Sequence, residues 1–149
     1  MTSPASAPTA TVTPEVIKHL EFIQAIISRL SNGSFLIKGW TLTVAGVFFG
    51  VLVGRPGWPL ASAGLIPIVG FWLLDSFFLR QERLFRRLYD DVRRPGTGVE
   101  LFSMNVQPYH SAVPWFEVVR SYTVVNFYGM LALIDVVFIG WGVVRALTS

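Results

Sequence analysis

Residues 39–74 read GWTLTVAGVFFGVLVGRPGWPLASAGLIPIVGFWLL and contain a single charged residue, Arg55. A membrane-spanning helix needs about 20 mostly apolar residues to cross a hydrocarbon core about 30 Å thick. The first apolar block reaches this length once residues 35–38 are included, and the second block, residues 56–74, follows directly after Arg55. Because so short a turn must return the chain, the two blocks predict an antiparallel transmembrane hairpin over residues 35–79.

The composition of the whole chain also favours a membrane protein. Hydrophobic residues make up 52% of the 149 residues, charged residues make up 14%, and the mean hydropathy is +0.55. A soluble domain of this size would leave much of that apolar surface in water. A third apolar block runs through Ser121 to Val144, which predicts a third span within residues 114–146.

The N-terminal part of the chain divides into a tail and a helix. Residues 1–12 are rich in Ala, Pro, Ser and Thr, which predicts a disordered tail. The TPE that follows is a typical helix start, and apolar residues then recur every three or four positions. Residues 13–33 are therefore expected to form an amphipathic cytoplasmic helix. The SNGS at residues 31–34 is expected to end this helix, with Gly33 in the left-handed cap position.

The helical pattern of the second span continues past the apolar block. Residues 80–94 contain no Gly or Pro, so one helix is expected to run from the bilayer into the cytoplasm. Residues 80–113 form a basic section of helix and loop, after which Pro114 opens a helix that continues into the third span. The predicted fold class is all-α: an integral membrane helical bundle of three transmembrane helices, an N-terminal amphipathic helix and cytoplasmic extensions of spans two and three.

The basic residues that flank the spans indicate the orientation of the chain. Three of them precede the first span and six arginines follow the second within residues 80–94, whereas Arg55 and Arg145 lie at the opposite ends. Short cytoplasmic segments carry an excess of Lys and Arg. We therefore expect a multi-pass protein among the lipids of the bacterial inner membrane, with the N-terminus cytoplasmic and the C-terminus periplasmic.

Asp135 lies near the middle of the third span, where an ionised carboxylate facing lipid would cost several kcal/mol. It is therefore expected to face protein or water. One interpretation is a protonated or hydrogen-bonded carboxyl group between helices. The other is a ring of Asp135 side chains that lines a cation path in an oligomer, and the sequence leaves both open.

Two further features concern helix packing. Lys38 and Asp75 lie at the same depth on the two arms of the hairpin, which predicts an ion pair between them and leaves a gating role open. Gly46, Gly50 and Gly54 form a double GxxxG ridge for close helix approach. The partner of this ridge is either the second span of the same chain or another subunit.

The basic section carries a surplus of positive charge. Arg86 with Asp90, and Arg87 with Asp91, are expected to form i,i+4 ion pairs. The remaining charge suits an anionic partner such as a nucleotide, an oligonucleotide or lipid head groups. The candidate ligand-binding residues are Lys18, Arg29, Arg83, Arg86, Arg87 and Arg93.

The sequence contains no motif typical of catalysis or metal binding. There is no HExxH, GxSxG or P-loop, and no cysteine. The two histidines, His19 and His110, lie far apart. We therefore expect no enzyme activity, catalytic residue, metal ion or cofactor.

Two stretches carry a resemblance to known proteins: LEFIQAIISRLSNGSFLIKGW at residues 20–40 and FWLLDSFFLRQERLFRRLYDDVR at residues 71–93. Together with FSMN at residues 102–105, they resemble a family of small bacterial membrane proteins encoded in antiphage defence loci. Members of this family are membrane effectors paired with nucleotidyltransferases, as in CBASS-like and Hailong-like systems. The resemblance implies a channel or membrane-damaging protein controlled by a nucleotide signal, and it assigns no ligand residue.

The leading hypothesis is an oligomeric ion channel or pore-forming effector in antiphage defence, gated by an anionic nucleotide-type ligand at its basic cytoplasmic face. We expect a homo-oligomer and assume four subunits, with the nucleotide or oligonucleotide made by a partner nucleotidyltransferase. The alternative is a non-conducting membrane anchor or assembly subunit that docks a soluble partner through residues 13–33 and 80–94. A phage-type holin is less favoured, because the C-terminal ALTS is nearly neutral.

Overall fold

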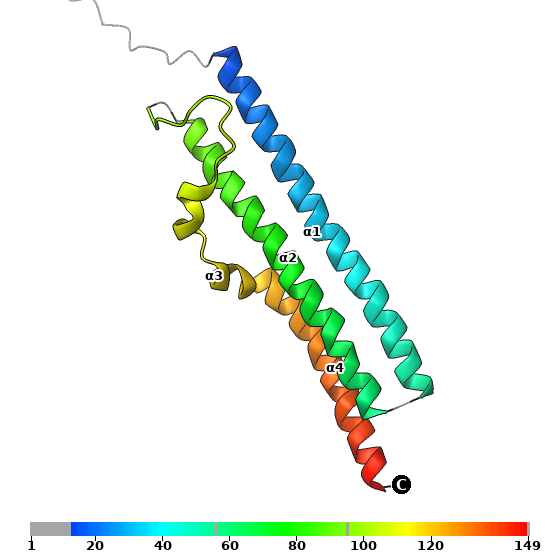
Figure 1. Cartoon of the computed structure of the whole chain (residues 1–149). Helices are drawn as coiled ribbons and strands as arrows, with labels where there is room; N and C mark the ends of the chain where they lie inside the picture. Colours follow the sequence, from blue (N-terminus) through cyan, green and yellow to red (C-terminus); the bar gives the residue numbers. More distant parts are fainter. Residues whose placement is uncertain (1–12, 56, 95, 149) are drawn as a thin grey trace, which may run out of the picture.

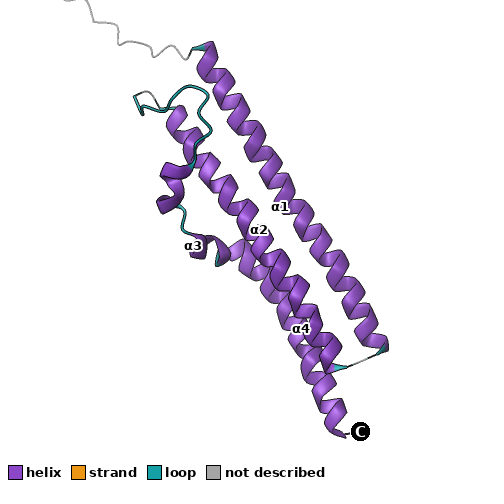
Figure 2. Ribbon diagram, viewed as in Figure 1, coloured by secondary structure: helices purple, strands orange, loops and turns teal. Residues whose placement is uncertain are grey.

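The computed structural model describes residues 13–55, 57–94 and 96–148, and the predicted tail at residues 1–12 lies outside the described residues. The described residues form helices and no strand (Figure 2). The elements are α1 (Pro14–Gly54), α2 (Trp58–Val92), the 3-10 helix η1 (Gln107–Ala112), α3 (Trp115–Val119) and α4 (Tyr122–Thr148). Helices α1, α2 and α4 are long and apolar enough to cross a membrane, which confirms the predicted all-α bundle of three spans.

Helix α2 is the central element of the bundle. Helices α1 and α2 run antiparallel along most of their length, and α4 packs against the other side of α2 (Figure 1). At 1.5 Å per residue, the 41 residues of α1 and the 35 of α2 make helices of about 60 and 50 Å, well beyond a hydrocarbon core of about 30 Å. We call the part beyond the spans the extension: residues 14–33 of α1, residues 80–92 of α2 and the segment 93–121.

Helix α1 does not break at residues 31–34, so the predicted helix end there is wrong. A Cβ atom on Gly33 would lie 2.7 Å from Cε1 of Phe78 on α2. Gly33 therefore lets the two long helices approach each other and is not a left-handed cap. The next residue, Ser34, is buried and donates a hydrogen bond to Asp75. Packing across the helix pair thus overrides the local turn signal.

The third helix is divided where the sequence predicted a continuous one. Helix α3 ends at Val119, and α4 begins at Tyr122 after Arg120 leaves helical geometry with φ −93° and ψ 9°. Nε1 of Trp72 donates a hydrogen bond of 3.1 Å to the Val119 carbonyl, and the Ser121 carbonyl accepts the first N–H groups of α4. A long-range bond and a new helix start therefore separate α3 from α4.

In the extension, the apolar stripes of the two long helices face each other. Ile23 and Ile27 of α1 are buried against Leu88 of α2, with Phe85, Tyr89 and Val92 around them. The N-terminal part of α1 therefore packs on the continuation of the second span. Burying three such side chains contributes about 1.5–3 kcal/mol each.

Polar contacts attach the connecting segment to these helices. Nε2 of His19 lies 2.9 Å from the Ser103 carbonyl, and the Phe102 N–H donates to Nδ1 of His19 over 3.3 Å. The Tyr109 hydroxyl donates a 2.9 Å hydrogen bond to Asp91. Burial, and then the neighbouring Asp91 carboxylate, raise the pKa of Tyr109 to about 12. The segment between the second and third spans is therefore held against the helix pair.

Replacing Gly33 with alanine tests the close approach of α1 and α2. The added methyl group meets the Phe78 ring, and such overpacking costs about 1–3 kcal/mol. Gly39→Ala is the matched control, because nothing lies within 4 Å of its added Cβ. Thermal unfolding of the two purified variants in detergent is expected to show a lower Tm for Gly33→Ala. Equal Tm values would contradict the packing role of Gly33.

Candidate functional site

The predicted ion pair between the arms of the hairpin is present. Nζ of Lys38 lies 2.6 Å from Oδ2 of Asp75, and it donates a second bond of 2.9 Å to the Ser34 hydroxyl. Ser34 in turn donates to Oδ1 of Asp75. Asp75 is fully buried, whereas the Lys38 side chain remains 23% exposed. The carboxylate therefore has donors on both oxygens, which offsets its loss of hydration.

Asp135 lies between α4 and α2 inside one subunit. It has no exposed surface, and a Cβ atom on Gly64 would lie 2.8 Å from its Oδ1. Neither carboxylate oxygen has a hydrogen-bond partner within the described part of the chain. Asp135 therefore lies between helices, as the first interpretation predicted. The hydrogen bond expected in that interpretation is missing among the described residues. At this point Gly64 allows the close approach of α4, and not of α1.

Two more polar residues continue the line of Asp135: Ser121, directly before α4, and Tyr128 on α4. Ser121, Tyr128 and Asp135 follow one another at seven-residue intervals, so they lie on one side of α4 and its N-terminal end, about 10 Å apart. Each carries a buried side-chain oxygen without a hydrogen bond of normal length among the described residues, and the Tyr128 hydroxyl lies near Thr41 and Asp75. We call this line the polar seam. Sequence reasoning missed Ser121 and Tyr128, although their heptad spacing to Asp135 was a usable signal.

The Tyr128 ring connects the polar seam to the other two spans. It is fully buried and stacks on Trp72 of α2, with ring centroids 6.2 Å apart and an interplanar angle of 2°. Its apolar neighbours include Ala45 of α1 and Ile68 of α2. All three spans therefore meet at the level of Tyr128.

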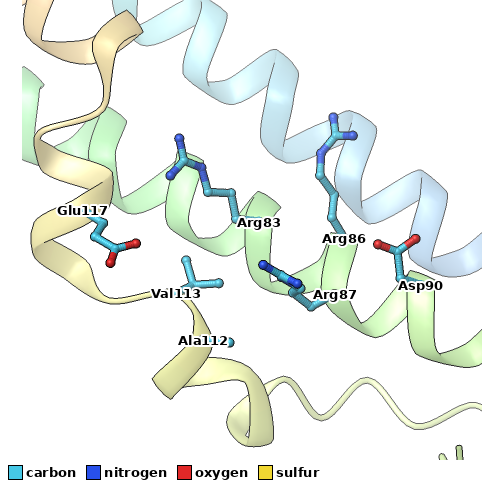
Figure 3. Close-up of a pocket in the computed structure, with 7 residues that line it drawn as sticks. All are labelled: Arg83, Arg86, Arg87, Asp90, Ala112, Val113 and Glu117. Atoms are coloured by element: carbon cyan, nitrogen blue, oxygen red, sulfur yellow. The ribbon is translucent and has the colours of Figure 1, made fainter.

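A second candidate site lies in the extension, where three arginines line a pocket of about 230 Å³. Figure 3 shows Arg83, Arg86 and Arg87 projecting from α2, with Glu117 and the end of η1 contributing the facing wall. The full lining is Arg83, Arg86, Arg87, Asp90, Ala112, Val113 and Glu117. We call it the arginine pocket.

The ion pairs around this pocket differ from the predicted ones. Arg86 pairs with Glu82, at 2.7 Å from Nη2, and not with Asp90. Asp90 lies 3.5 Å from Arg93 instead. Arg87 does not pair with Asp91, because that carboxylate accepts the Tyr109 hydroxyl and lies 3.9 Å from Arg94. The pairs that form also follow helical spacings of three or four residues, and only the Tyr109 contact with Asp91 comes from outside α2.

Three charged groups of the arginine pocket are left without an ion pair. Across residues 13–55, 57–94 and 96–148, no opposite charge lies within 4 Å of Arg83, Arg87 or Glu117. The pocket therefore presents two available guanidinium groups on one wall and one available carboxylate on the other.

The other predicted ligand-binding residues do not join this pocket. Lys18 pairs with Glu21 at 2.8 Å and lies 5.5 Å from the centre of the Phe22 ring. Arg29 lines a separate, mostly apolar hollow with Met104. Arg93 lies at the end of α2 beside Asp90. Three of the six candidate residues thus line the arginine pocket, and the other three lie apart from it.

The glycine ridge of α1 faces outward from the subunit. Gly46, Gly50 and Gly54 are exposed, and nothing lies within 4 Å of a Cβ atom built on any of them. The ridge therefore does not pack against the second span of the same chain. Among the described residues there is also no group of three or more His, Cys, Asp or Glu side chains that could hold a metal ion.

A double-mutant cycle tests the electrostatic character of the Lys38–Asp75 pair. Asp75→Leu leaves the Lys38 ammonium at the membrane boundary without its counter-charge, and breaking a buried pair costs about 3–5 kcal/mol. We expect the lower end of that range, because Lys38 keeps 23% of its side-chain exposure. The double variant Lys38→Met, Asp75→Leu should recover most of the loss in thermal stability. If the double variant is no more stable than Asp75→Leu, charge pairing is not what joins the helices.

Comparisons with known proteins give no relative for this chain. No protein-family model, no curated protein and no solved structure matches it. A proposal about its function therefore has to start from the geometry of its own residues.

Proposed function

We propose that this membrane protein conducts ions, and the observation that carries the proposal is the buried carboxyl group of Asp135, which has no hydrogen-bond partner among the described residues. A buried polar group without a hydrogen bond costs about 1–3 kcal/mol, and more when it is charged. Ionisable residues inside a membrane are rare and mark ion or proton pathways. Ser121 and Tyr128 support this reading, because they add buried polar atoms on the same side of the bundle, the first without a hydrogen bond among the described residues and the second near Thr41 and Asp75.

Control of conduction would come from the extension through α2. Arg83 in the arginine pocket and Gly64 beside Asp135 lie on the same unbroken helix, 19 residues or about 28 Å apart. A ligand that binds one arrangement of the extension more tightly than another shifts the population of the two. We propose an anionic ligand of the nucleotide type at this basic face.

The conducting form is proposed to be a homo-oligomer, with four subunits as the working assumption. The outward-facing ridge of Gly46, Gly50 and Gly54 supports this, because small-residue ridges allow close approach of helices in membranes. The second GxxxG partner would then come from another subunit. In such an assembly, the α2–α4 contact at Gly64 and Asp135 has to loosen before ions can reach the carboxylate.

The biological setting proposed for this activity is bacterial antiphage defence at the inner membrane. Its support is the resemblance of residues 20–40 and 71–93 to small membrane effectors that act with nucleotidyltransferases. The proposed orientation places the extension in the cytoplasm, in keeping with its six arginines within residues 80–94. A nucleotide made in the cytoplasm would then have direct access to the extension.

A specific observation favours a second candidate function, a non-conducting anchor for a soluble partner. Ile17, Phe22, Leu101 and Phe102 lie in the extension and are each between 45% and 49% exposed. Exposed apolar side chains of this kind can dock another protein. An anchor predicts no ion flux in purified, reconstituted protein, so the experiment below separates the two functions.

Asp135→Asn tests the conduction proposal, because it removes the charge at nearly constant volume. Cation conductance in planar bilayers is expected to fall by about tenfold or more, which corresponds to a change of at least about 1.4 kcal/mol at the site. Unchanged conductance and selectivity would contradict the assignment of Asp135 to the ion path.

A matched pair of glycine variants on α2 extends this test. Gly64→Ala pushes a methyl group toward Oδ1 of Asp135 and is expected to alter the conductance, whereas Gly70→Ala meets nothing within 4 Å and should not. Absence of ion flux in the unmodified, reconstituted protein, both without ligand and with anionic nucleotides added, would favour the anchor.

A further inference from the structure

The arginine pocket is built on a rigid frame. Nε of Arg80 donates a 3.0 Å hydrogen bond to the Val113 carbonyl, and Trp72 binds the Val119 carbonyl at the other end of α3. Between these two bonds, Val113 and Val118 are buried against Leu84 of α2. The wall that faces the arginines is therefore fixed at three points, so the pocket exists before any ligand enters it.

The charges of the pocket select an anion of limited size. Within the described part of the chain, Arg83 and Arg87 carry guanidinium groups without an ion pair, while Glu82 pairs with Arg86. Guanidinium groups bind phosphate oxygens bidentately. The volume of about 230 Å³ is below the roughly 300–1,000 Å³ typical of sites for drug-sized ligands. One phosphate group with a small substituent fits this space.

Glu117 adds a second requirement for the ligand. Its carboxylate lines the pocket opposite the arginines (Figure 3) and has no ion pair among the described residues. A bare phosphate would meet repulsion there, whereas a hydroxyl or ammonium group next to the phosphate would donate to this carboxylate. The preferred ligand therefore carries a hydrogen-bond donor close to its phosphate group.

The position of the pocket relative to the membrane is marked by aromatic residues. Phe116 on α3 is 77% exposed, and Tyr122 at the start of α4 is 82% exposed. Aromatic side chains at the ends of membrane spans lie at the level of the lipid head groups. Arg83 is eight residues, or about 12 Å, beyond Asp75 along α2. The pocket therefore opens close to the membrane surface, where lipid phosphates are concentrated.

We propose that the arginine pocket binds a single phosphate group, held by Arg83 and Arg87, that bears a neighbouring hydroxyl or ammonium group recognised by Glu117. This chemistry has two sources: the head group of a membrane lipid and the phosphate of a soluble nucleotide. Occupancy of the pocket would favour one arrangement of α2 over another, and this consequence of binding rests on the proposed function. Binding itself is measured without any ion flux.

The test uses the full chain, purified in a neutral detergent, and isothermal titration calorimetry. The probes are short-chain phosphatidylglycerol, short-chain phosphatidylcholine, adenosine monophosphate and inorganic phosphate. Phosphatidylglycerol offers hydroxyl donors beside its phosphate, whereas phosphatidylcholine offers none. We expect the affinity for phosphatidylglycerol or for the nucleotide to exceed that for phosphatidylcholine and inorganic phosphate by about tenfold, or about 1.4 kcal/mol.

Two variants with the same change in net charge separate a built site from general attraction. Arg83→Gln with Arg87→Gln should weaken binding of the preferred probe by about tenfold or more, and Arg29→Gln with Arg94→Gln, which lie outside the pocket, by less than about twofold. Glu117→Gln should reduce the preference for phosphatidylglycerol over phosphatidylcholine. Equal losses in the two double variants, or no binding of any probe, would overturn the proposal.

The outcomes also identify the source of the phosphate and stay separate from the conduction test. Tight binding in the phosphatidylglycerol arm supports the site with a lipid ligand, and tight binding in the adenosine monophosphate arm supports it with a soluble one. If the phosphate binds as expected while Asp135→Asn leaves the conductance unchanged, the pocket stands and the proposed function fails. If conductance depends on Asp135 but no probe binds, the pocket fails alone.

Discussion

The contact between Lys38, Ser34 and Asp75 determines how the two long helices are aligned. A buried carboxylate needs a counter-charge and hydrogen-bond donors, and α1 supplies both from residues four positions apart. Sliding α1 along α2 by even one turn would separate these groups by about 5 Å. The same register brings Gly33 against Phe78 on one side and Ala45 into the cluster with Ile68 on the other.

The alignment of α1 and α2 prepares the surface on which α4 packs. Gly142 lies so close to α2 that a Cβ atom would be 2.7 Å from the Trp58 backbone nitrogen, and Gly64 makes a similar close approach to Asp135. The close contact between α2 and α4 buries the Asp135 carboxyl group, and burial of an apolar residue there would cost less free energy. Asp135 thus lies buried, and without a hydrogen bond among the described residues, at a close contact between α2 and α4, which is why it is the strongest functional candidate.

Much of this architecture could be predicted from the sequence because hydropathy acts locally. The uncharged blocks predicted the three spans, and the antiparallel geometry of the hairpin predicted that Lys38 and Asp75 lie at the same depth. The errors arise where distant residues decide the outcome. Gly33 looks like a helix cap in the sequence, but it packs against Phe78. Trp72 binds the Val119 carbonyl, 47 positions away, where the third helix is interrupted.

The candidate sites were predictable only in part, for the same reason. Asp135 stands out in any hydropathy profile, but its contact with Gly64 requires the packing of α4 on α2. The arginines of α2 are evident in the sequence, yet Glu82 and Tyr109 decide which of them remain available. The facing wall comes from Val113 and Glu117, which helical spacing on α2 cannot reveal.

Helices α1 and α2 continue unbroken from the spans into the extension, which we propose to be cytoplasmic, and Lys38 and Asp75 join them at its boundary. The chain contains no cysteine, so single cysteines report their surroundings without a background. Labelling with a membrane-impermeant maleimide in oriented vesicles tests this at exposed positions with Ser28→Cys, Thr43→Cys, Ser111→Cys and Thr148→Cys. Ser28→Cys and Ser111→Cys should react from the cytoplasmic side, Thr148→Cys from the opposite side, and Thr43→Cys from neither. Protection of Ser28→Cys, or its reaction from the same side as Thr148→Cys, would contradict the account.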